Sequence, residues 1–423
     1  MSSRSFPWRS RAVRVLLLML TTAAACLSRE GLARGGDWPQ ILGPNRNGIA
    51  GEEKLADKWP KEGPRSLWEA KIGAGFAGVA VAEGVVVLFH RLADEDTLSA
   101  YDAESGKPLW SQGFPTNFQP AIVEDGGPRA VPTIHQGRVY ALAAAGGLYC
   151  VDIKSGKPIW QRQTSKDFHV PSAYFGAGSS PLIEGKTLIL NVGGDKDKAG
   201  IVAFDINTGK TVWQATTEQA SYSSPIVTTL EDQRVLLCVT RLNFVALDPA
   251  TGKELARTPF GQRGPTVNGA IPVLIGSRVL LTASYGIGAE LVSVSRTKFD
   301  IVWQDEVLSS QYTTPIVHDG AVFGIDGRQD GGPISLKCFD PETRKVHWTE
   351  TGLAYATLIA ADGKLLVLHT NGTARLLELN KSEYRELGSA NLLRGTTRAL
   401  PALANGRLYV RNEQTLKCVQ LKP

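Results

Sequence analysis

Short runs of aliphatic, β-branched and aromatic residues recur along the chain from about residue 78 onward, separated by glycine, proline and charged residues. Residues 138–142 (Arg-Val-Tyr-Ala-Leu) and 186–190 (Lys-Thr-Leu-Ile-Leu) are two of these runs. Their length and composition favour strands over helices, because β-branched and aromatic side chains pack well on a pleated surface. The pattern therefore predicts an all-β protein made of many short strands.

The strands fall into a repeated unit. Most units open with a proline-containing strand, turn at a glycine, continue through two apolar runs, and end in the phrase Asp-x-x-Ser/Thr-Gly-Lys-x-x-Trp. The phrase occupies residues 102–110, 152–160 and 205–213, and residues 340–348 carry a copy with Arg344 in the glycine position. Aspartate can accept a bond from the nearby backbone and glycine takes a positive φ, so the phrase predicts a tight turn. Four strands joined by hairpin turns, repeated at this interval, predict a β-propeller blade.

Eight units can be counted. They are predicted at residues 78–113, 128–163, 178–216, 222–258, 268–305, 312–350, 353–390 and 397–423. Two units are degenerate, with Ala256 and Gly388 where others have tryptophan, and the last has room for only three strands. Residues 66–72 resemble a fourth strand that has no blade of its own. The prediction is an eight-bladed β-propeller of four-stranded antiparallel blades over residues 66–423, closed by an N-terminal strand that removes exposed sheet edges.

The tryptophan of the phrase is predicted to be a packing residue. A flat ring on the outer strand fills the gap between sheets that widens away from the axis, and its burial contributes about 2–3 kcal/mol. Its N–H then needs an acceptor. This place is taken by Trp68, Trp110, Trp160, Trp213, Trp303 and Trp348. The phrase is therefore interpreted as structural and is not assigned to a cofactor site.

Residues 1–33 are predicted to be a signal peptide. Arg9, Arg11 and Arg14 precede the apolar run 15–20, and small residues follow, which is the order of a secretory signal. The apolar run is too short to span a membrane. The expectation is an exported protein of the periplasm or the extracellular space.

Cleavage after Ala33 would leave a mature chain that begins with an extended segment over residues 34–65. Lipoprotein anchoring through Cys26 is the less favoured alternative, because Ala23 stands where a larger aliphatic residue is usual. The formal charge of the whole chain is +5. The predicted signal peptide carries five arginines and one glutamate, so the mature chain is near neutral. A nucleic-acid partner is therefore not expected, and neither is a transmembrane helix.

The cysteines are expected to be small buried residues without disulfides. Cys150, Cys338 and Cys418 fall on equivalent strands of different units, which are too far apart to bond. The chain has no Cys-x-x-Cys or Cys-Cys pair, and its histidines form no short-spaced pair. No metal or redox site is indicated by these residue types.

The turn phrase resembles the tryptophan-docking motif of the pyrroloquinoline quinone (PQQ) dehydrogenase-like propellers. Residues 100–110 and 203–213 carry the resemblance most closely, and it covers most of residues 66–423. Residues 37–48 (Asp-Trp-Pro-Gln-Ile-Leu-Gly-Pro-Asn-Arg-Asn-Gly) are similar to the N-terminal segment of exported PQQ-like repeat proteins of planctomycete-type bacteria. The superfamily includes quinoprotein dehydrogenases and also cofactor-free BamB-type assembly lipoproteins, so the resemblance implies a fold more than a chemistry.

The dehydrogenase branch of the family would imply a calcium-held PQQ in the central channel and a carboxylate base. Calcium prefers six to eight oxygen ligands. The alcohol-oxidising members also carry an adjacent Cys-Cys disulfide and a tryptophan floor under the cofactor. This chain has no adjacent cysteines, and its tryptophans are accounted for by docking places and the N-terminal region. No cofactor and no catalytic residue are therefore expected, and PQQ with calcium remains the alternative.

Several polar residues are predicted at one mouth of the channel. Tyr222, Asn268 and Tyr312 precede first strands of blades, and Arg241, Arg328 and Asp330 follow second strands. Together these six could hold a carboxylate-rich ligand, because the guanidinium fork matches a carboxylate. The competing interpretation is an ordinary set of polar residues around a water-filled channel.

Three functions remain in view. The favoured one is an exported, monomeric binding or scaffold module that takes a protein or small-molecule ligand on one propeller face, since loops on a rigid ring form a recognition surface. The second is a PQQ-dependent oxidoreductase. The third is a BamB-like component of outer-membrane assembly.

Overall fold

The computed structural model describes residues 36–122, 125–171, 175–264 and 266–423, together with Met1. The predicted signal peptide, its cleavage position and Cys26 lie outside the described residues. The described residues from 36 onward belong to one compact unit. No helix within the described ranges is long and apolar enough to cross a membrane.

The first four blades follow one another along the chain. Blade 1 consists of β2 (Val79–Ala82), β3 (Val85–Leu92), β4 (Glu95–Asp102) and β5 (Pro108–Pro115). Blade 2 consists of β6 (Thr133–His135), β7 (Arg138–Leu142), β8 (Gly147–Asp152) and β9 (Pro158–Gln163). Blade 3 consists of β10 (Leu182–Glu184), β11 (Thr187–Asn191), β12 (Ile201–Asp205) and β13 (Thr211–Ala215). Blade 4 consists of β14 (Ile226–Leu230), β15 (Gln233–Val239), β16 (Asn243–Leu247) and β17 (Glu254–Pro259).

The remaining blades continue in the same order. Blade 5 consists of β18 (Val273–Ile275), β19 (Arg278–Ala283), β20 (Gly288–Val294) and β21 (Phe299–Asp305). Blade 6 consists of β22 (Ile316–His318), β23 (Ala321–Arg328), β24 (Gly331–Phe339) and β25 (Val346–Thr351). Blade 7 consists of β26 (Ala356–Ala361), β27 (Lys364–His369), β28 (Thr373–Glu378) and β29 (Glu386–Asn391). Blade 8 consists of β30 (Ala402–Ala404), β31 (Arg407–Arg411), β32 (Thr415–Gln420) and β1 (Ser66–Lys71).

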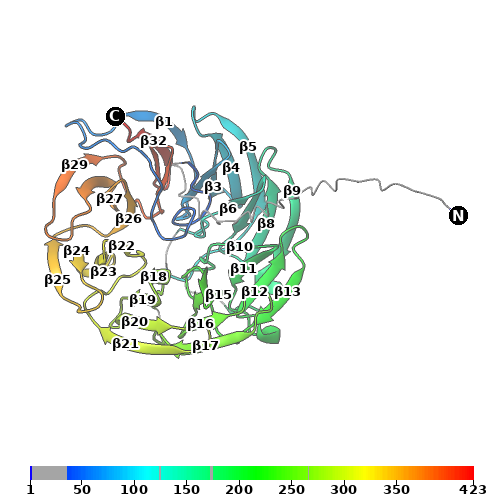
Figure 1. The fold of residues 1–423 in the computed structure, drawn as a ribbon. Coiled ribbons are helices and arrows are strands. Elements are labelled where there is room, and N and C mark those ends of the chain that lie inside the picture. Colours follow the sequence, from blue (N-terminus) through cyan, green and yellow to red (C-terminus); the bar gives the residue numbers. More distant parts are fainter. Residues whose placement is uncertain (2–35, 123–124, 172–174, 265) are drawn as a thin grey trace. The chain divides into compact units, whose positions relative to one another are not determined.

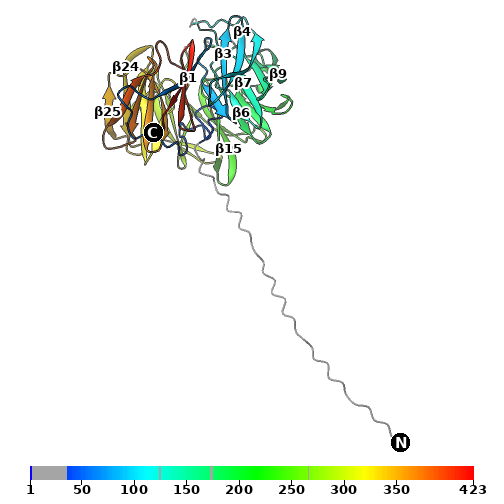
Figure 2. The same ribbon diagram turned by 90° about the horizontal axis from the view of Figure 1, so that it is seen from above.

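Eight four-stranded antiparallel sheets stand around a common axis, with the first strand of each blade innermost (Figure 1). Two short helical turns interrupt the loops: α1 (Thr164–Asp167) and the 3₁₀ turn η1 (Lys196–Lys198). The predicted fold and the count of eight blades are confirmed. The predicted closure is also found, because β1 pairs antiparallel with β32 in blade 8 (Figure 2).

Each docking tryptophan packs on the turn of the following blade. Nε1 of Trp110 donates to the carbonyl oxygen of Ile153 at 2.7 Å. A Cβ atom placed on Gly156, whose φ is +70°, would lie 2.4 Å from the Trp110 ring. The glycine is therefore needed both for its positive φ and for the room it leaves the ring. The same pair of contacts recurs at Trp68, Trp160 and Trp213.

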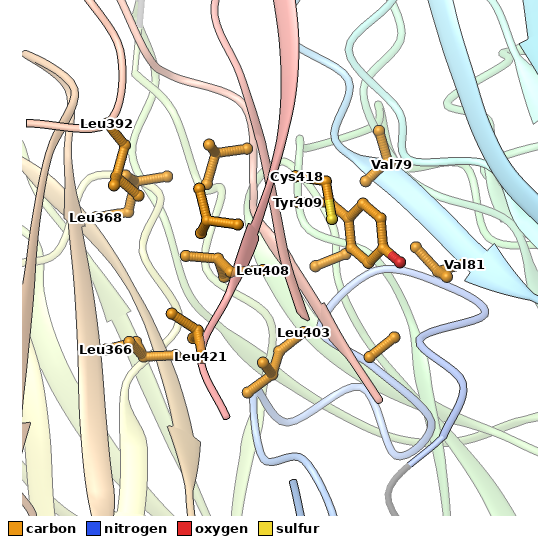
Figure 3. Close-up of a cluster of buried hydrophobic side chains, with 14 of the residues drawn as sticks. Val79, Val81, Leu366, Leu368, Leu392, Leu403, Leu408, Tyr409, Cys418 and Leu421 are labelled. Carbon is orange, nitrogen blue, oxygen red and sulfur yellow. The ribbon is translucent and has the colours of Figure 1, made fainter. Parts of the chain in front are cut away.

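The junction that closes the ring is one continuous apolar cluster (Figure 3). Trp68 on β1 donates its Nε1 to the carbonyl oxygen of Ala103 in blade 1 at 3.3 Å. The closing strand thus docks on its neighbour as an ordinary fourth strand does. The cluster draws on blades 7, 8 and 1 through Leu366, Leu368, Leu403, Leu408, Tyr409, Val79 and Val81.

The four cysteines within the described ranges are buried and unbonded, as expected. Burial raises the pKa of each thiol to about 12, so all four stay protonated and act as small apolar residues. They are Cys150, Cys238, Cys338 and Cys418.

Residues 37–50, termed the plug, lie among the innermost strands of the ring. Trp38 pairs with Val81 of blade 1, and Ala50 donates its N–H to the carbonyl oxygen of Ala360 in blade 7 at 2.9 Å. The plug therefore joins blades at opposite ends of the sequence. The sequence predicts only an extended segment over residues 34–65, and its aperiodic pattern does not indicate a place inside the ring.

Arg46 fixes the middle of the plug to blade 3. Its side chain is 4% exposed, and it donates to the carbonyl oxygens of Ser180 at 3.1 Å and Pro181 at 2.9 Å and to Oε1 of Gln40 at 2.9 Å. Burial lowers the pKa of the guanidinium to about 9. The carbonyl oxygens offset the desolvation of the charge, which explains how an arginine can sit between inner strands.

Residues 51–62, termed the strap, continue from the plug over blade 7. The N–H groups of Glu53 and Leu55 donate to the carboxylate of Asp362 at 3.2 Å and 2.8 Å. Trp59 is 9% exposed and packs against Gly388, where a Cβ atom would lie 2.7 Å from the Trp59 Cβ. The degenerate blade 7, which has no docking tryptophan of its own, is thus packed by a tryptophan from the strap.

Candidate binding cavity

A cavity of about 520 Å³ opens at the mouth of the central channel. Much of the cavity wall comes from one position of the repeat. In most blades this position lies three residues before the proline that precedes the first strand. Blades 1 and 7 lack that proline, but Phe76 and Tyr355 lie six residues before the end of β2 and β26, as Arg129 does before the end of β6. In blade order the eight residues of this inner ring are Phe76, Arg129, Gly178, Tyr222, Gly269, Tyr312, Tyr355 and Arg398. All except Tyr355 line the cavity.

Tyr355 lies behind the wall and holds it. Its hydroxyl accepts from the backbone N–H groups of Tyr312 at 2.9 Å and Thr313 at 3.1 Å. The ring centres of Tyr312 and Tyr355 are 4.5 Å apart. The inner ring therefore has a fixed support on the side of blades 6 and 7. On the N-terminal side, Ile41 of the plug contributes to the wall.

The structure brings four of the six predicted site residues into the cavity wall: Tyr222, Tyr312, Arg328 and Asp330. Asn268 is 2% exposed and does not form part of the wall. Its side-chain Nδ2 donates to the backbone carbonyl oxygen of Arg241 at 3.2 Å. Its backbone carbonyl oxygen accepts from the backbone N–H of Tyr222 at 3.1 Å. Asn268 is thus placed to position Tyr222.

Both predicted arginines have partners of their own. Arg328 forms a two-point ion pair with Asp330, with Nε to Oδ1 at 3.0 Å and Nη2 to Oδ2 at 2.6 Å, and its guanidinium lies 4.2 Å from the ring centre of Tyr285. Arg241 donates to Oγ1 of Thr266 at 2.6 Å. The charge of Arg328 is therefore largely matched before any ligand enters, and Arg241 is directed into its own loop.

Two arginines that the sequence interpretation did not select lie in the wall beside one aromatic ring. The guanidinium of Arg129 is 5.6 Å and that of Arg398 is 5.2 Å from the ring centre of Phe76. Among the described residues Arg398 forms no hydrogen bond or ion pair, and its Nε is buried without a partner. A signal for both was present in the sequence, because each occupies the same offset from its proline as Tyr222 and Tyr312.

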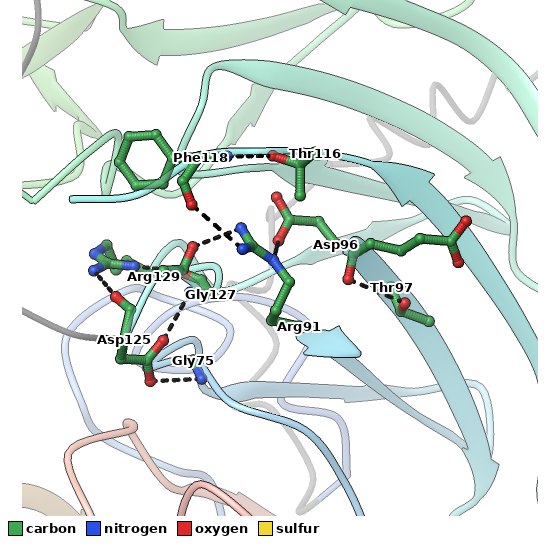
Figure 4. Close-up of polar contacts among 11 residues, drawn as sticks. Gly75, Arg91, Asp96, Thr97, Thr116, Phe118, Asp125, Gly127 and Arg129 are labelled. Atoms are coloured by element: carbon green, nitrogen blue, oxygen red, sulfur yellow. Dashed lines mark hydrogen bonds and ion pairs between the residues drawn. The ribbon is translucent and has the colours of Figure 1, made fainter. Parts of the chain in front are cut away.

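Arg129 is held by the loop that carries it (Figure 4). It donates to the carbonyl oxygens of Asp125 at 2.5 Å and of Gly127. The Asp125 carboxylate accepts from the N–H groups of Gly75 at 2.8 Å and Gly127 at 2.7 Å. Burial is the main reason that the pKa of Arg129 is lowered, with the charge of Asp125 opposing it. The partners of this guanidinium are carbonyl oxygens, so its positive charge is not paired by a direct salt bridge within the described chain.

Next to this network, Arg91 forms a buried ion pair with Asp96 at 2.8 Å and donates to the carbonyl oxygen of Gly126 at 2.7 Å (Figure 4). Burial raises the pKa of Asp96, and the hydrogen bond from Arg91 opposes that shift. The pair fixes the backbone just before Arg129. The network is therefore a support for the cavity wall.

The tyrosines of the wall stay neutral near pH 7. Burial raises the pKa of Tyr222 and raises that of Tyr312 well above the ordinary value. Tyr312 donates its hydroxyl to Oε1 of Gln329 at 2.6 Å, and the Tyr222 hydroxyl accepts from the N–H of Phe175 at 3.1 Å. These phenols therefore offer polar groups and aromatic surface without negative charge.

Metal ligands are sparse around the cavity. Asp330 is the one carboxylate in its described wall, and it is already paired with Arg328. Over the ranges that the structure covers, no three histidine, cysteine, aspartate or glutamate side chains come together as a metal site. The wall thus combines three guanidinium groups and several aromatic rings with aliphatic side chains.

Comparison with known families agrees with the architecture. The family model described as "Outer membrane protein assembly factor BamB" matches residues 60–216 and 125–350, which together span more than half of the chain. The chain belongs to this family.

Curated relatives include both assembly factors and dehydrogenases. The chain is 29% identical over 211 residues to "1-butanol dehydrogenase (cytochrome c)" of Thauera butanivorans, covering 48% of this chain and 29% of that protein. It is 28% identical over 120 residues to the BamB protein of Burkholderia pseudomallei, covering 28% of this chain and 27% of that protein. The matched regions span less than a third of each relative.

Solved structures confirm the fold. The crystal structure of BamB from Moraxella catarrhalis has a TM-score of 0.61 and 17% identity, with 85% of this chain and 98% of that chain covered. A europium-containing methanol dehydrogenase has a TM-score of 0.65 and 11% identity, with 89% of each chain covered. At these identities the likeness concerns the propeller alone.

Proposed function

We propose that this chain is an exported propeller that acts as a non-catalytic binding module through the cavity at the channel mouth. The composition of the inner ring carries the proposal: aromatic and guanidinium groups face one another, and the only carboxylate of the described wall is paired. A concave site with apolar walls and a few convergent polar groups is suited to holding a small ligand. The rigid ring supplies the support.

A calcium-held PQQ is a poor fit to these residues. Calcium requires several oxygen ligands, largely carboxylates and carbonyls, and Asp330 is engaged by Arg328 through both carboxylate oxygens. No tryptophan contributes to the described wall. The arginines alone would suit the carboxylates of such a cofactor, but the metal and the base would lack a place. This disagreement favours binding over dehydrogenation.

The test is to add PQQ and Ca²⁺ to the purified protein and to follow quinone absorbance together with dye-linked alcohol oxidation. The binding-module proposal expects no turnover. Stoichiometric PQQ binding with alcohol-dependent dye reduction would overturn it and support the dehydrogenase alternative, which rests on relatives such as the butanol dehydrogenase of Thauera butanivorans.

A BamB-like role is a second alternative, and the family match favours it. It predicts that the protein is recovered from cell envelopes in a stable complex with the central outer-membrane assembly protein. Recovery of the protein free of that component, at physiological salt and in mild detergent, would contradict this role.

Export rests on the predicted signal peptide. Sequencing the N-terminus of the protein isolated from its native cells should find residue 34 first. A lipid-modified Cys26 at the N-terminus would show that the exported protein is a lipid-anchored form and not a soluble one. An intact Met1 would contradict export.

A further inference from the structure

Phe76 has a guanidinium near it from each neighbouring blade, at 5.6 Å for Arg129 and 5.2 Å for Arg398. We propose that Arg129 and Arg398 form an anion-binding pair and that the cavity takes a small aromatic carboxylate, whose acid group lies between the two guanidiniums and whose ring lies against the tyrosines. The inference rests on the proposed binding function and names the class of its ligand.

The charge distribution favours an anion. Arg129 and Arg398 belong to blades 2 and 8, so the two cations flank blade 1 at the same level of the inner ring. Neither forms an ion pair with a described carboxylate, in contrast to Arg328, which is neutralised by Asp330. The two guanidiniums lie 5.6 Å and 5.2 Å from the same Phe76 ring centre, so an anion beside that ring is attracted by both charges.

Arg398 also has unused hydrogen-bonding capacity. Its Nε is buried without a partner in the described part of the chain. A buried donor left unpaired costs free energy, so the side chain gains when an acceptor arrives. A carboxylate has two oxygens in a plane and matches the guanidinium fork, which makes it a better partner than a single carbonyl oxygen.

The rest of the wall specifies an aromatic body. Tyr222 is near enough to Arg129, and Tyr312 near enough to Arg398, for the charge of each arginine to lower the pKa of the tyrosine beside it against the effect of burial. Phe175 packs on Tyr222 with ring centres 5.7 Å apart. Aromatic faces on both sides favour a flat ring in offset or edge contact. The glycines at the two remaining wall positions of the inner ring, Gly178 and Gly269, carry no side chain to block it.

Calorimetric titration with 2-naphthoate and with its neutral counterpart 2-naphthamide tests the ligand class. The two probes share a ring system and differ in charge. We expect 2-naphthoate to bind at least tenfold more tightly, with an affinity that falls as salt is added, because charge-assisted hydrogen bonds are worth more than neutral ones. Equal affinity for both probes would overturn the anion pair.

Arg398→Gln tests the residue, because within the described residues the side chain makes no hydrogen bond or ion pair that the variant would break, and its contact with Phe76 is the one interaction lost. We expect a tenfold or larger loss of 2-naphthoate affinity, no change for 2-naphthamide, and partial recovery in Arg398→Lys. Arg328→Gln is the matched control: it lines the same cavity but is paired with Asp330, and its effect should stay within threefold. An equal loss in both variants would contradict the assignment.

Two further results distinguish the ligand class from the proposed binding function. Inorganic phosphate that competes as strongly as 2-naphthoate would overturn the aromatic part of the proposal and leave a general anion site. PQQ-dependent turnover would overturn the proposed function itself, whereas equal binding of naphthoate and naphthamide would leave a binding module with the wrong ligand class. Thermal melting of each variant, compared with the unmodified protein, excludes unfolding as the cause of lost binding.

Discussion

The glycine of the turn phrase meets two requirements: its backbone takes a positive φ, and a tryptophan ring of the neighbouring blade packs against it. Gly156 has a φ of +70°, and a Cβ there would come within 2.4 Å of the Trp110 ring. Gly276 has a φ of +58° and open space around it. The two sites therefore share the backbone requirement and differ only in the tryptophan contact.

We expect Gly156→Ala to lower the free energy of unfolding by about 1–3 kcal/mol more than Gly276→Ala does, since the extra methyl group must displace a packed ring. Urea unfolding followed by tryptophan fluorescence measures the difference. Equal losses in the two variants would mean that the backbone conformation alone accounts for the glycine.

Glu290 on β20 is a buried carboxyl group at 5% exposure with one oxygen, Oε2, that lacks a partner in the described structure. Burial raises its pKa to about 7. Well below pH 4.5, the ordinary pKa of glutamate, the group is neutral in both folded and unfolded chains. As pH rises to 7 the unfolded chain ionises first, so the folded protein loses stability over this window.

Glu290→Gln should therefore stabilise the protein above pH 7 by about 3 kcal/mol relative to the unmodified chain, and the gain should fade towards pH 4.5. Melting temperatures across pH 4–8 give the comparison. Glu52→Gln, at an exposed position of the strap, is the control for the exchange of a carboxyl group for an amide. A gain that does not vary with pH would contradict the assigned pKa.

At the scale of elements, the strap supplies blade 7 with the packing tryptophan that its own outer strand lacks. Trp59 lies against Gly388 on β29, and it belongs to the same apolar cluster as Trp68 and Leu366. Blade 7 thus has no docking tryptophan of its own, yet its outer strand is packed by Trp59.

Trp59→Ala should cost about 3–5 kcal/mol of unfolding free energy, as expected for a large aromatic residue removed from a packed site. Lys58→Ala, one residue earlier and exposed, should leave stability unchanged. Limited proteolysis of the strap provides a second measurement. Unchanged stability in Trp59→Ala would show that blade 7 packs without the strap.

The elements that repeat could be predicted from the sequence, and those that occur once could not. Predicted blade limits such as 128–163 and 178–216 agree closely with the strands found, because the turn phrase fixes the register. The plug has no periodic pattern, since its residues contact several blades in turn. Its place depends on packing that a linear pattern does not carry.

The candidate site shows the same division. Tyr222 and Tyr312 are predicted from their place before the first strand of a blade, and the structure puts both in the cavity wall. Arg129 and Arg398 share their offset from the following proline, a finer pattern than the one that the prediction uses. Whether an arginine is free or paired depends on neighbours in space. Arg328 finds Asp330 two residues away, whereas Arg398 lies beside Phe76 of another blade. The sequence therefore indicates the ring of positions but not their electrostatic state.

At the scale of the whole molecule, the ring depends on strand β1 for closure. Removing residues 34–72 would leave β32 with an open edge and take away Trp68, Trp59 and the plug. We expect the truncated protein to melt at a clearly lower temperature and to aggregate through the exposed edge. Calorimetry and light scattering would detect both effects. A truncated protein that melts like the mature form would contradict the closure by β1.

Closure by β1 also affects the order in which the strands can pair during folding. Trp68 faces Cys418 across the closing pair, so the first strand to leave the ribosome must wait for the last before it can be hydrogen-bonded in place. Joining segments 350 residues apart carries a loop-closure cost of about 5 kcal/mol, which must be met before the final blade is complete. We therefore expect sealing to come late in folding, and a circularly permuted chain that begins at blade 1 and carries β1 after β32 should fold faster while reaching the same ring.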